Sequence, residues 1–169
     1  MSTDTLSLET LSEAEQLLYL EADLLDRHHW DDWIALYTKD CVFWVPSWDT
    51  EEELIDDPEV EVNMVYLKGL PAIEARLVRI RSRDAYALTP LPKTAHLVTN
   101  VRVVAERDEI IEVSAKWTTL CLEPRRGKTW RGGWYDYTLR RTDAGLRIQT
   151  KKIVLLEGMI DGTIDIYQI

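Results

Sequence analysis

The fold of this chain is decided by one stretch, residues 24–46, which reads LLDRHHWDDWIALYTKDCVFWVP. Its apolar residues first recur at the i, i+3, i+4 and i+7 spacing of one helix face: Trp30, Trp33, Ile34 and Tyr37. The polar triplet 38–40 then predicts the end of this short helix. The aromatic and β-branched run 41–45, followed by Pro46, predicts a strand. A helix is therefore expected to turn directly into a strand through a heavily aromatic join.

A longer helix and an acidic loop are predicted on either side of this join. The S-x-x-E pattern at residues 12–15 is typical of a capping box, so a helix is expected over about 12–27, after a loose arm at residues 1–11. Residues 47–61 are rich in Asp and Glu. This favours a solvated loop or lid over a metal site, because the Asp/Asn–Gly spacing of a calcium loop is absent. Residues 62–67 then predict a short strand.

The next predicted helix is basic, although the chain as a whole is acidic. Pro71 stands in the first turn, where proline is favoured, and an apolar face follows it. Four arginines lie largely off that face: Arg76, Arg79, Arg81 and Arg83. Two interpretations stay open, namely a solvated face paired with nearby acids and a docking surface for an acidic patch elsewhere.

The second half of the chain is typical of an antiparallel meander. Alternating apolar residues predict strands over about 97–103, 111–122, 135–139 and 146–155, with Leu97, Thr99, Val101 and Val103 on one face. The apolar face changes between Ile148 and Ile153, which predicts a β-bulge and a bent sheet. The sequence therefore predicts an α+β fold, in which a curved, mixed or antiparallel sheet wraps around the N-terminal helices.

Composition restricts the functional class. The chain has 169 residues, 46% hydrophobic and 30% charged, which predicts one globular domain over residues 1–169. Its formal net charge of −10 disfavours nucleic acid and membrane surfaces as partners. A secretory signal and a membrane-spanning apolar run are both absent from the sequence, so a cytoplasmic protein is expected. Cys41 and Cys121 are expected to be buried free thiols.

Few side chains are candidates for chemistry. The histidines are His28, His29 and His96, and the sequence lacks paired cysteines and phosphate-binding glycine motifs. His28 and His29 are adjacent, so on a helix they would point about 100° apart, which is poor geometry for a shared metal. For His96 we weigh a hydrogen-bonded structural histidine against a general base in a pocket. No catalytic residue, metal or cofactor is predicted in this chain.

Tryptophans at irregular positions are the remaining signal. Trp44 and Trp48 flank Pro46, and Trp130 and Trp134 flank a pair of glycines. Aromatic residues at such places often serve in interfaces, and a position in the core is an equal alternative for each of them.

Four segments together resemble one family: residues 30–46, TAHLVTNV at 94–101, the strand at 151–156 and DIYQI at 165–169. In this order and spacing they resemble the β (small) subunits of Rieske-type aromatic-ring-hydroxylating dioxygenases, in the benzoate and anthranilate branch. The resemblance covers residues 12–169 and implies a cone-shaped fold of the nuclear-transport-factor-two-like, or SnoaL-like, class. The tail departs from the family pattern, since Gln168 follows Tyr167 where a histidine is usual.

The resemblance also implies a non-catalytic function. In the family, a larger α subunit carries the Rieske [2Fe-2S] cluster and the mononuclear iron, commonly in a hexamer of three α and three β chains, and a reductase supplies electrons. Ligand counting agrees, because those two centres need four histidines and this chain has three.

We therefore expect an assembly subunit of an aromatic-carboxylate dioxygenase. Five residues are predicted at its subunit interface: Trp48, Arg79, Trp130, Trp134 and Tyr167. Two alternatives remain, a stand-alone dehydratase or isomerase that uses His96 as its general base and a small-ligand binding module.

Overall fold

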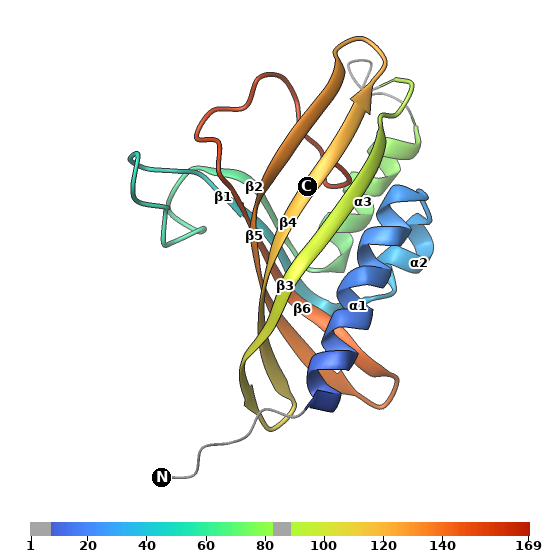
Figure 1. Cartoon of the computed structure of the whole chain (residues 1–169), viewed down its shortest axis with the longest axis vertical. Coiled ribbons are helices and arrows are strands. Elements are labelled where there is room, and N and C mark those ends of the chain that lie inside the picture. Colours follow the sequence, from blue (N-terminus) through green and yellow to red (C-terminus); the bar gives the residue numbers. More distant parts are fainter. Residues whose placement is uncertain (1–7, 83–88) are drawn as a thin grey trace.

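A computed structural model describes residues 8–82 and 89–169 (Figure 1). Its elements in chain order are α1 (Leu8–Asp26), α2 (Trp30–Ile34), β1 (Tyr37–Pro46), β2 (Asn63–Lys68), α3 (Leu70–Arg81), β3 (Lys93–Arg107), β4 (Ile110–Glu123), β5 (Gly127–Thr142) and β6 (Gly145–Leu155).

The strands form one curved sheet in the order β2-β1-β6-β5-β4-β3. Neighbouring strands pair antiparallel except β1 and β6, which pair parallel. This parallel pair brings the first strand of the chain beside the last one. The strand that follows the helical part of residues 24–46 is therefore an interior strand, with β2 on one side and β6 on the other.

The helices pack on one side of the sheet (Figure 1). Helix α1 contacts β3 and β6, and α3 contacts β1 and β2. Large aromatic side chains fill the space between them, and Trp33, Phe43, Trp117 and Tyr135 are all almost completely buried. The predicted α+β arrangement, a bent sheet around helices, is confirmed.

The predicted bulge in the last strand is present. Gln149 is the extra residue of β6, since Thr150 pairs with Thr138 whereas Ile148 pairs with Leu139. The inserted residue moves the following side chains to the opposite face of the strand. The pattern that predicted the bulge is therefore explained by the strand register.

A second bulge was not predicted. Asn100 in β3 has a positive φ of 53° and lies where the pairing with β4 shifts, between Thr99 and Arg102. Odd-numbered residues such as Val101 face inward after the bulge, whereas even-numbered residues face inward before it. Leu97 is therefore half exposed, although it was expected on the same face as Val101. The predicted single face of this strand is wrong, because one inserted residue inverts the alternation.

Helix α1 begins earlier than its sequence cap. It starts at Leu8, so the capping-box pattern at residues 12–15 lies inside the helix and the predicted arm is shorter, with residues 1–7 outside the described residues. Thr10 is buried, and its Oγ1 donates a hydrogen bond to Glu106 Oε1 at 3.2 Å. A tertiary contact with the far end of β3 accounts for the extra turn.

The helix-to-strand join is tighter than predicted. Helix α2 ends at Ile34, and Tyr37 to Asp40 belong to β1 rather than to a helix end and a turn. The backbone N–H of Ile148 donates to Leu36 O at 2.8 Å, so pairing with β6 competes with continuation of the helix. The strand is irregular here, with a register shift between Tyr37 and Val42.

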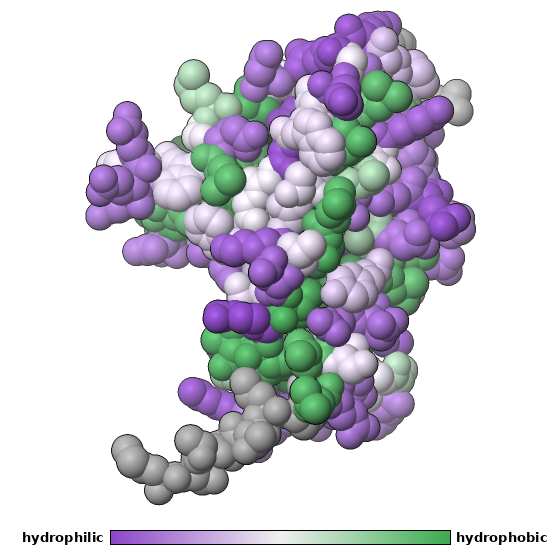
Figure 2. Space-filling view, viewed as in Figure 1, coloured by the Kyte–Doolittle hydropathy of each residue, from purple (hydrophilic) through white to green (hydrophobic). Residues whose placement is uncertain are grey.

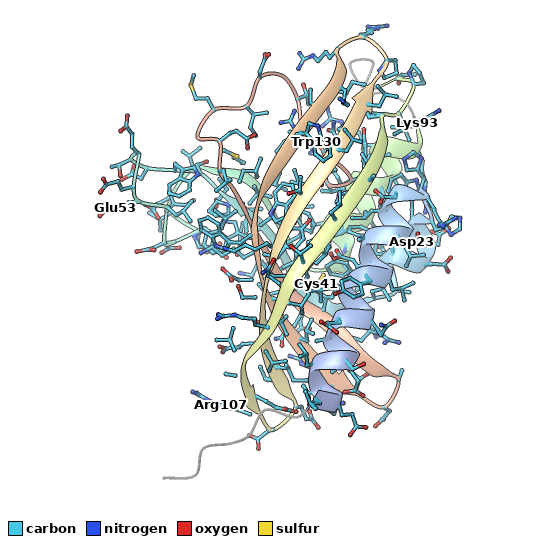
Figure 3. The ribbon with its side chains drawn as sticks, in the orientation of Figure 1. Asp23, Cys41, Glu53, Lys93, Arg107 and Trp130 are labelled. Atoms are coloured by element: carbon cyan, nitrogen blue, oxygen red, sulfur yellow. The ribbon has the colours of Figure 1, made fainter. Side chains whose placement is uncertain are left out.

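The acidic loop projects from the sheet between β1 and β2, with Glu53 at its outer end (Figure 3). Most of its carboxylates are exposed, whereas Ile55 is buried. At the other end of the chain, the last four residues, 166–169, are completely buried in the chain's own core. Cys41 and Cys121 are buried free thiols, as predicted.

Candidate functional site

A buried ion pair occupies the interior of the curved sheet. Glu21 extends from α1 and Lys151 from β6, with Lys151 Nζ 2.9 Å from Glu21 Oε1 and both side chains at most 2% exposed. The Glu21 carboxylate accepts three further hydrogen bonds, from the hydroxyls of Tyr37 (2.6 Å) and Tyr137 (2.7 Å) and from the indole N–H of Trp33 (3.3 Å). This network fills the interior between α1 and the inner face of the sheet.

The network keeps Glu21 ionised. Burial alone would raise the pKa of Glu21, but the charge of Lys151 and the tyrosine hydroxyls lower that pKa below its ordinary value. Burial and the nearby Glu21 charge raise the pKa of Tyr37 and Tyr137 well above 10.0. The carboxylate therefore stays charged and the phenols stay protonated near neutral pH, which suits a structural function better than proton transfer.

Sequence analysis missed this ion pair. Glu21 lies within the apolar stripe of α1, and a charged residue at a core position was the signal that could have found it. Lys151 follows the bulge at Gln149, which turns it inward. The sequence offered no signal that these two residues meet.

His96 is bound to Asp26 and closed off from solvent. Its side chain is 1% exposed, its Nδ1 lies 2.6 Å from Asp26 Oδ1, and its backbone N–H donates to Asp26 Oδ2 at 2.9 Å. Thr94 Oγ1 also donates to Asp26, at 2.8 Å. These bonds tie the end of α1 to β3, and Nε2 is buried without a hydrogen-bond partner among the described residues.

The Asp26 carboxylate is held in its charged form. Burial raises its pKa, but the hydrogen bonds and charge interaction with His96 outweigh burial and lower the pKa below its ordinary value. An aspartate–histidine pair of this kind can orient a base, but here the ring has no exposed edge to offer a substrate.

The other two histidines stand apart from this pair. His28 has a positive φ of 58° and stacks on Trp30 at 4.9 Å between ring centroids, while His29 is exposed at the start of α2. No group of three His, Cys, Asp or Glu side chains in residues 8–82 and 89–169 could hold a metal ion.

Two of the predicted interface tryptophans meet on the outer face of the sheet, away from the helices. Trp48 and Trp134 pack edge to face at 6.4 Å, and Trp48 Nε1 donates to Leu155 O at 2.8 Å. Lys116 lies over the Trp134 ring at 5.2 Å. From the sequence, both residues stood at irregular positions with interface and core as equal alternatives, whereas Trp134 is a strand residue and the pair forms one aromatic site.

Trp130 lies farther along β5 on the same face and is 53% exposed (Figure 3). Its strand neighbour is Leu120, and the nearby Leu97 and Leu122 are also about half exposed. Figure 2 shows apolar residues in a strip over the long strands. An exposed apolar strip of this kind marks a contact surface more often than a free one.

The remaining two predicted interface residues lie elsewhere. Tyr167 is completely buried against Trp30, with ring centroids 5.7 Å apart, so it offers no exposed contact. Gln168 beside it donates from Nε2 to Cys121 Sγ at 3.5 Å. Arg79 is exposed on α3, on the helical side of the molecule.

The arginines of α3 divide between the two interpretations. Arg76 pairs with Asp165 at 2.8 Å and Arg81 pairs with Asp31, so these two bind acids of their own chain. Arg79 makes no ion pair with any residue that the structure describes. Arg83 lies outside the described residues.

Comparison with known proteins identifies the relatives. A family model described as ring-hydroxylating beta subunit matches residues 20–162. The chain is 35% identical to the small subunit of 2-halobenzoate 1,2-dioxygenase of Burkholderia cepacia, covering 90% of this chain and 92% of that one. It is also 35% identical to the anthranilate 1,2-dioxygenase small subunit of Acinetobacter baylyi, covering 97% and 100%.

The fold agrees with these relatives. The crystal structure of the beta subunit of benzoate 1,2-dioxygenase from Burkholderia mallei superposes with a TM-score of 0.77 at 28% identity, over the full length of both chains. The cone-shaped class that the sequence resemblance implied is thereby confirmed. In the described part of the chain, no helix has both the length and the apolar character needed to cross a membrane.

Proposed function

The chain belongs to the ring-hydroxylating β-subunit family, and from this premise we propose that it is the non-catalytic small subunit of a dioxygenase that acts on an aromatic carboxylate. The observation that carries the proposal is the family match over residues 20–162, joined to relatives of the same length whose names specify halobenzoate and anthranilate. A small subunit of a multicomponent oxygenase has a larger subunit as its partner.

The larger subunit would hold the Rieske [2Fe-2S] cluster and the mononuclear iron. The complete enzyme would add both atoms of dioxygen to the ring, with electrons supplied by a reductase, and would contain three copies of each chain in the cytoplasm. The histidine count supports this division of labour, because three histidines cannot furnish both iron centres.

The interior favours a supporting function over stand-alone catalysis. In a dehydratase or isomerase, His96 would need a substrate within hydrogen-bond reach, yet its side chain is 1% exposed. The Glu21–Lys151 network fills the adjacent core, which leaves little room for a small-ligand module. Neither alternative has a specific observation in its favour.

We place the contact with the larger subunit on the outer face of the sheet. Trp48 and Trp134 form a packed aromatic pair there, and Trp130 adds an exposed ring. Tryptophans are the residues most often found as energetic anchors of interfaces. Arg79 is exposed on the helical side of the molecule and would contribute a charged contact at the edge of the subunit interface. Tyr167 is buried, so it would affect assembly only by stabilising the fold of this chain.

Co-expression with the larger subunit tests this proposal. Trp130→Ala should weaken assembly by about 2 kcal/mol, roughly 30-fold, without lowering the melting temperature of the free chain, because the ring is half exposed. Tyr19→Ala is the matched control, since Tyr19 is a 41% exposed aromatic residue on α1. Arg79→Ala should slow association mainly at low salt.

The outcome that contradicts the proposal is equally clear. If the wild-type chain, expressed with the larger subunit from its own source, elutes as a monomer free of iron-containing protein, the subunit function fails. If Trp130→Ala and Tyr19→Ala assemble equally well, the subunit function stands and the outer-face contact is wrong.

A further inference from the structure

Arg131 is a buried cation with no acidic side chain within ion-pair distance among residues 8–82 and 89–169. It lies on the inward face of β5 and is only 8% exposed. Among the described residues its guanidinium makes no hydrogen bond and no ion pair within 4.0 Å, and its Nε is completely buried. A guanidinium cannot shed its charge at ordinary pH, so burial without a partner is unfavourable and calls for a carboxylate or another acceptor.

The groups around Arg131 are also short of partners. Strand pairing places Arg131 beside Thr119, and Thr119 beside His96, across the inner face of the sheet. Each of these residues has a buried polar atom without a partner in the described chain. Glu123 Oε1, on the same face of β4, is a further one, and the Glu123 carboxylate lies 4.0 Å from Arg126 but not within ion-pair distance of Arg131. Native structures leave few such atoms, so a cluster of them marks a place where a polar group is missing.

This cluster reaches the surface at the edge of the sheet. The last β5 residue paired with β6 is Gly133, and Gly132 O still accepts a hydrogen bond from Leu156 N at 3.0 Å, so residues 127–131 have no strand beside them on that side. A pocket of about 480 Å³ opens at this edge, and both Thr129 and Arg131 line it. Glu157 and Asp161 line the same pocket, but neither lies within ion-pair distance of Arg131.

The rim of the pocket is apolar and exposed. Trp130 is 53%, Leu122 50% and Met159 90% exposed, and Trp130 and Met159 line the pocket itself. Aromatic residues, Met and Arg are the residues enriched in protein interfaces, where a desolvated centre is surrounded by contacts that exclude water.

We propose that this pocket receives an Asp or Glu side chain of the larger subunit, which pairs with Arg131 while neighbouring apolar residues of that subunit cover Trp130 and Met159. The inference rests on the proposed function and adds the chemistry of its central contact. A second copy of this chain is the weaker candidate, because two chains of formal net charge −10 repel each other. The pocket is continuous with the outer-face surface at Trp130.

The test compares three variants of the full chain, each co-expressed with the larger subunit. Arg131→Met removes the charge and keeps the length, Arg131→Lys keeps the charge without the two-pronged geometry, and Lys128→Met is the control for loss of an exposed charge on the same strand. Arg131→Met should weaken assembly at least 10-fold, Arg131→Lys by less, and Lys128→Met by less than about 2-fold.

The free chain provides the second readout. Because Arg131 has no hydrogen-bond or ion-pair partner among the residues that the structure describes, Arg131→Met should melt at the same temperature as wild type or higher. The carboxylate is then located by reversal: Arg131→Glu should abolish assembly, and one Asp→Lys or Glu→Lys substitution in the larger subunit should restore it.

Three results would overturn the inference. One is assembly of Arg131→Met at wild-type strength, which would leave the proposed function intact. Another is a lower melting temperature of free Arg131→Met, which would mean that Arg131 is paired within its own chain. The last is self-association of the free chain that Arg131→Met abolishes, which would make the partner a second copy. Failure of the wild-type chain to assemble at all would instead refute the proposed function.

Discussion

Replacing Lys151 by Met isolates the contribution of the buried ion pair. Methionine has a similar length and no charge, so the substitution leaves Glu21 in the core without its cation. Breaking a buried pair by removing one partner costs about 3–5 kcal/mol, because the remaining charge is uncompensated. The hydroxyls of Tyr37 and Tyr137 still bind the carboxylate, so we expect the lower end of this range, about 3 kcal/mol of unfolding free energy at pH 7.

The loss should depend on pH, with a definite sign. In the wild type the folded-state pKa of Glu21 is lowered, so its contribution to stability is present above the unfolded pKa near 4.5 and is lost as pH falls through the folded pKa. In Lys151→Met the lysine charge no longer opposes the effect of burial, so the folded-state pKa of Glu21 rises. The variant should therefore lose stability as pH rises above about 4.5, where Glu21 must ionise without its cation. The difference between the two proteins should therefore be large at pH 7 and smaller at pH 4.5.

Urea unfolding followed by tryptophan fluorescence at both pH values measures this difference. Lys152→Met is the matched control, because Lys152 is the next residue and lies over Trp44 on the outer face at 4.5 Å. It should cost no more than about 1 kcal/mol, at either pH. A loss below about 1 kcal/mol for Lys151→Met at pH 7, or a loss independent of pH, would refute the reasoning.

Other predictions follow from single contacts. Asp26→Asn should lower the free energy of unfolding by about 1–3 kcal/mol, because it weakens the hydrogen bond to His96. The folded-state pKa of Asp26 is lowered, so protonation of Asp26 destabilises the wild type at acid pH and the variant should be less sensitive to acid. Urea titrations at pH 7 and pH 3.5 measure both effects. Gly133→Ala should lower the free energy of unfolding by about 1–3 kcal/mol, because the new Cβ would lie 1.9 Å from the carbonyl oxygen of Val154 in β6. Gly158 has open space around it, so Gly158→Ala should leave the melting temperature unchanged when the two variants are compared by thermal melts. Deleting residues 167–169 should lower the free energy of unfolding by at least about 3 kcal/mol, because the buried side chains of Tyr167 and Ile169 are lost. An unchanged melting temperature after this deletion would contradict the burial of the tail in the core.

The sequence determined the local elements of this protein. The spacing of Trp30, Trp33 and Ile34 predicts the short helix, and the alternation of residues 111–117 and 135–139 predicts strands whose inward faces the structure confirms. The change of face in the last strand revealed the bulge at Gln149. These features could be predicted because each depends on periodicity within a few residues, which the hydrophobic effect imposes on any half-buried element.

The tertiary structure alone decided which distant side chains meet. Glu21 and Lys151 are 130 residues apart, and no local pattern indicates that β1 pairs in parallel with β6 and so places Lys151 opposite α1. Strand register and contacts between remote segments likewise decide the bulge at Asn100, the extension of α1 to Leu8 and the burial of Arg131 without an ion pair among the described residues. Such contacts are set by the simultaneous packing of the whole core, in which a shift of one residue inverts a face, so they cannot be found from the neighbours of any residue in the sequence.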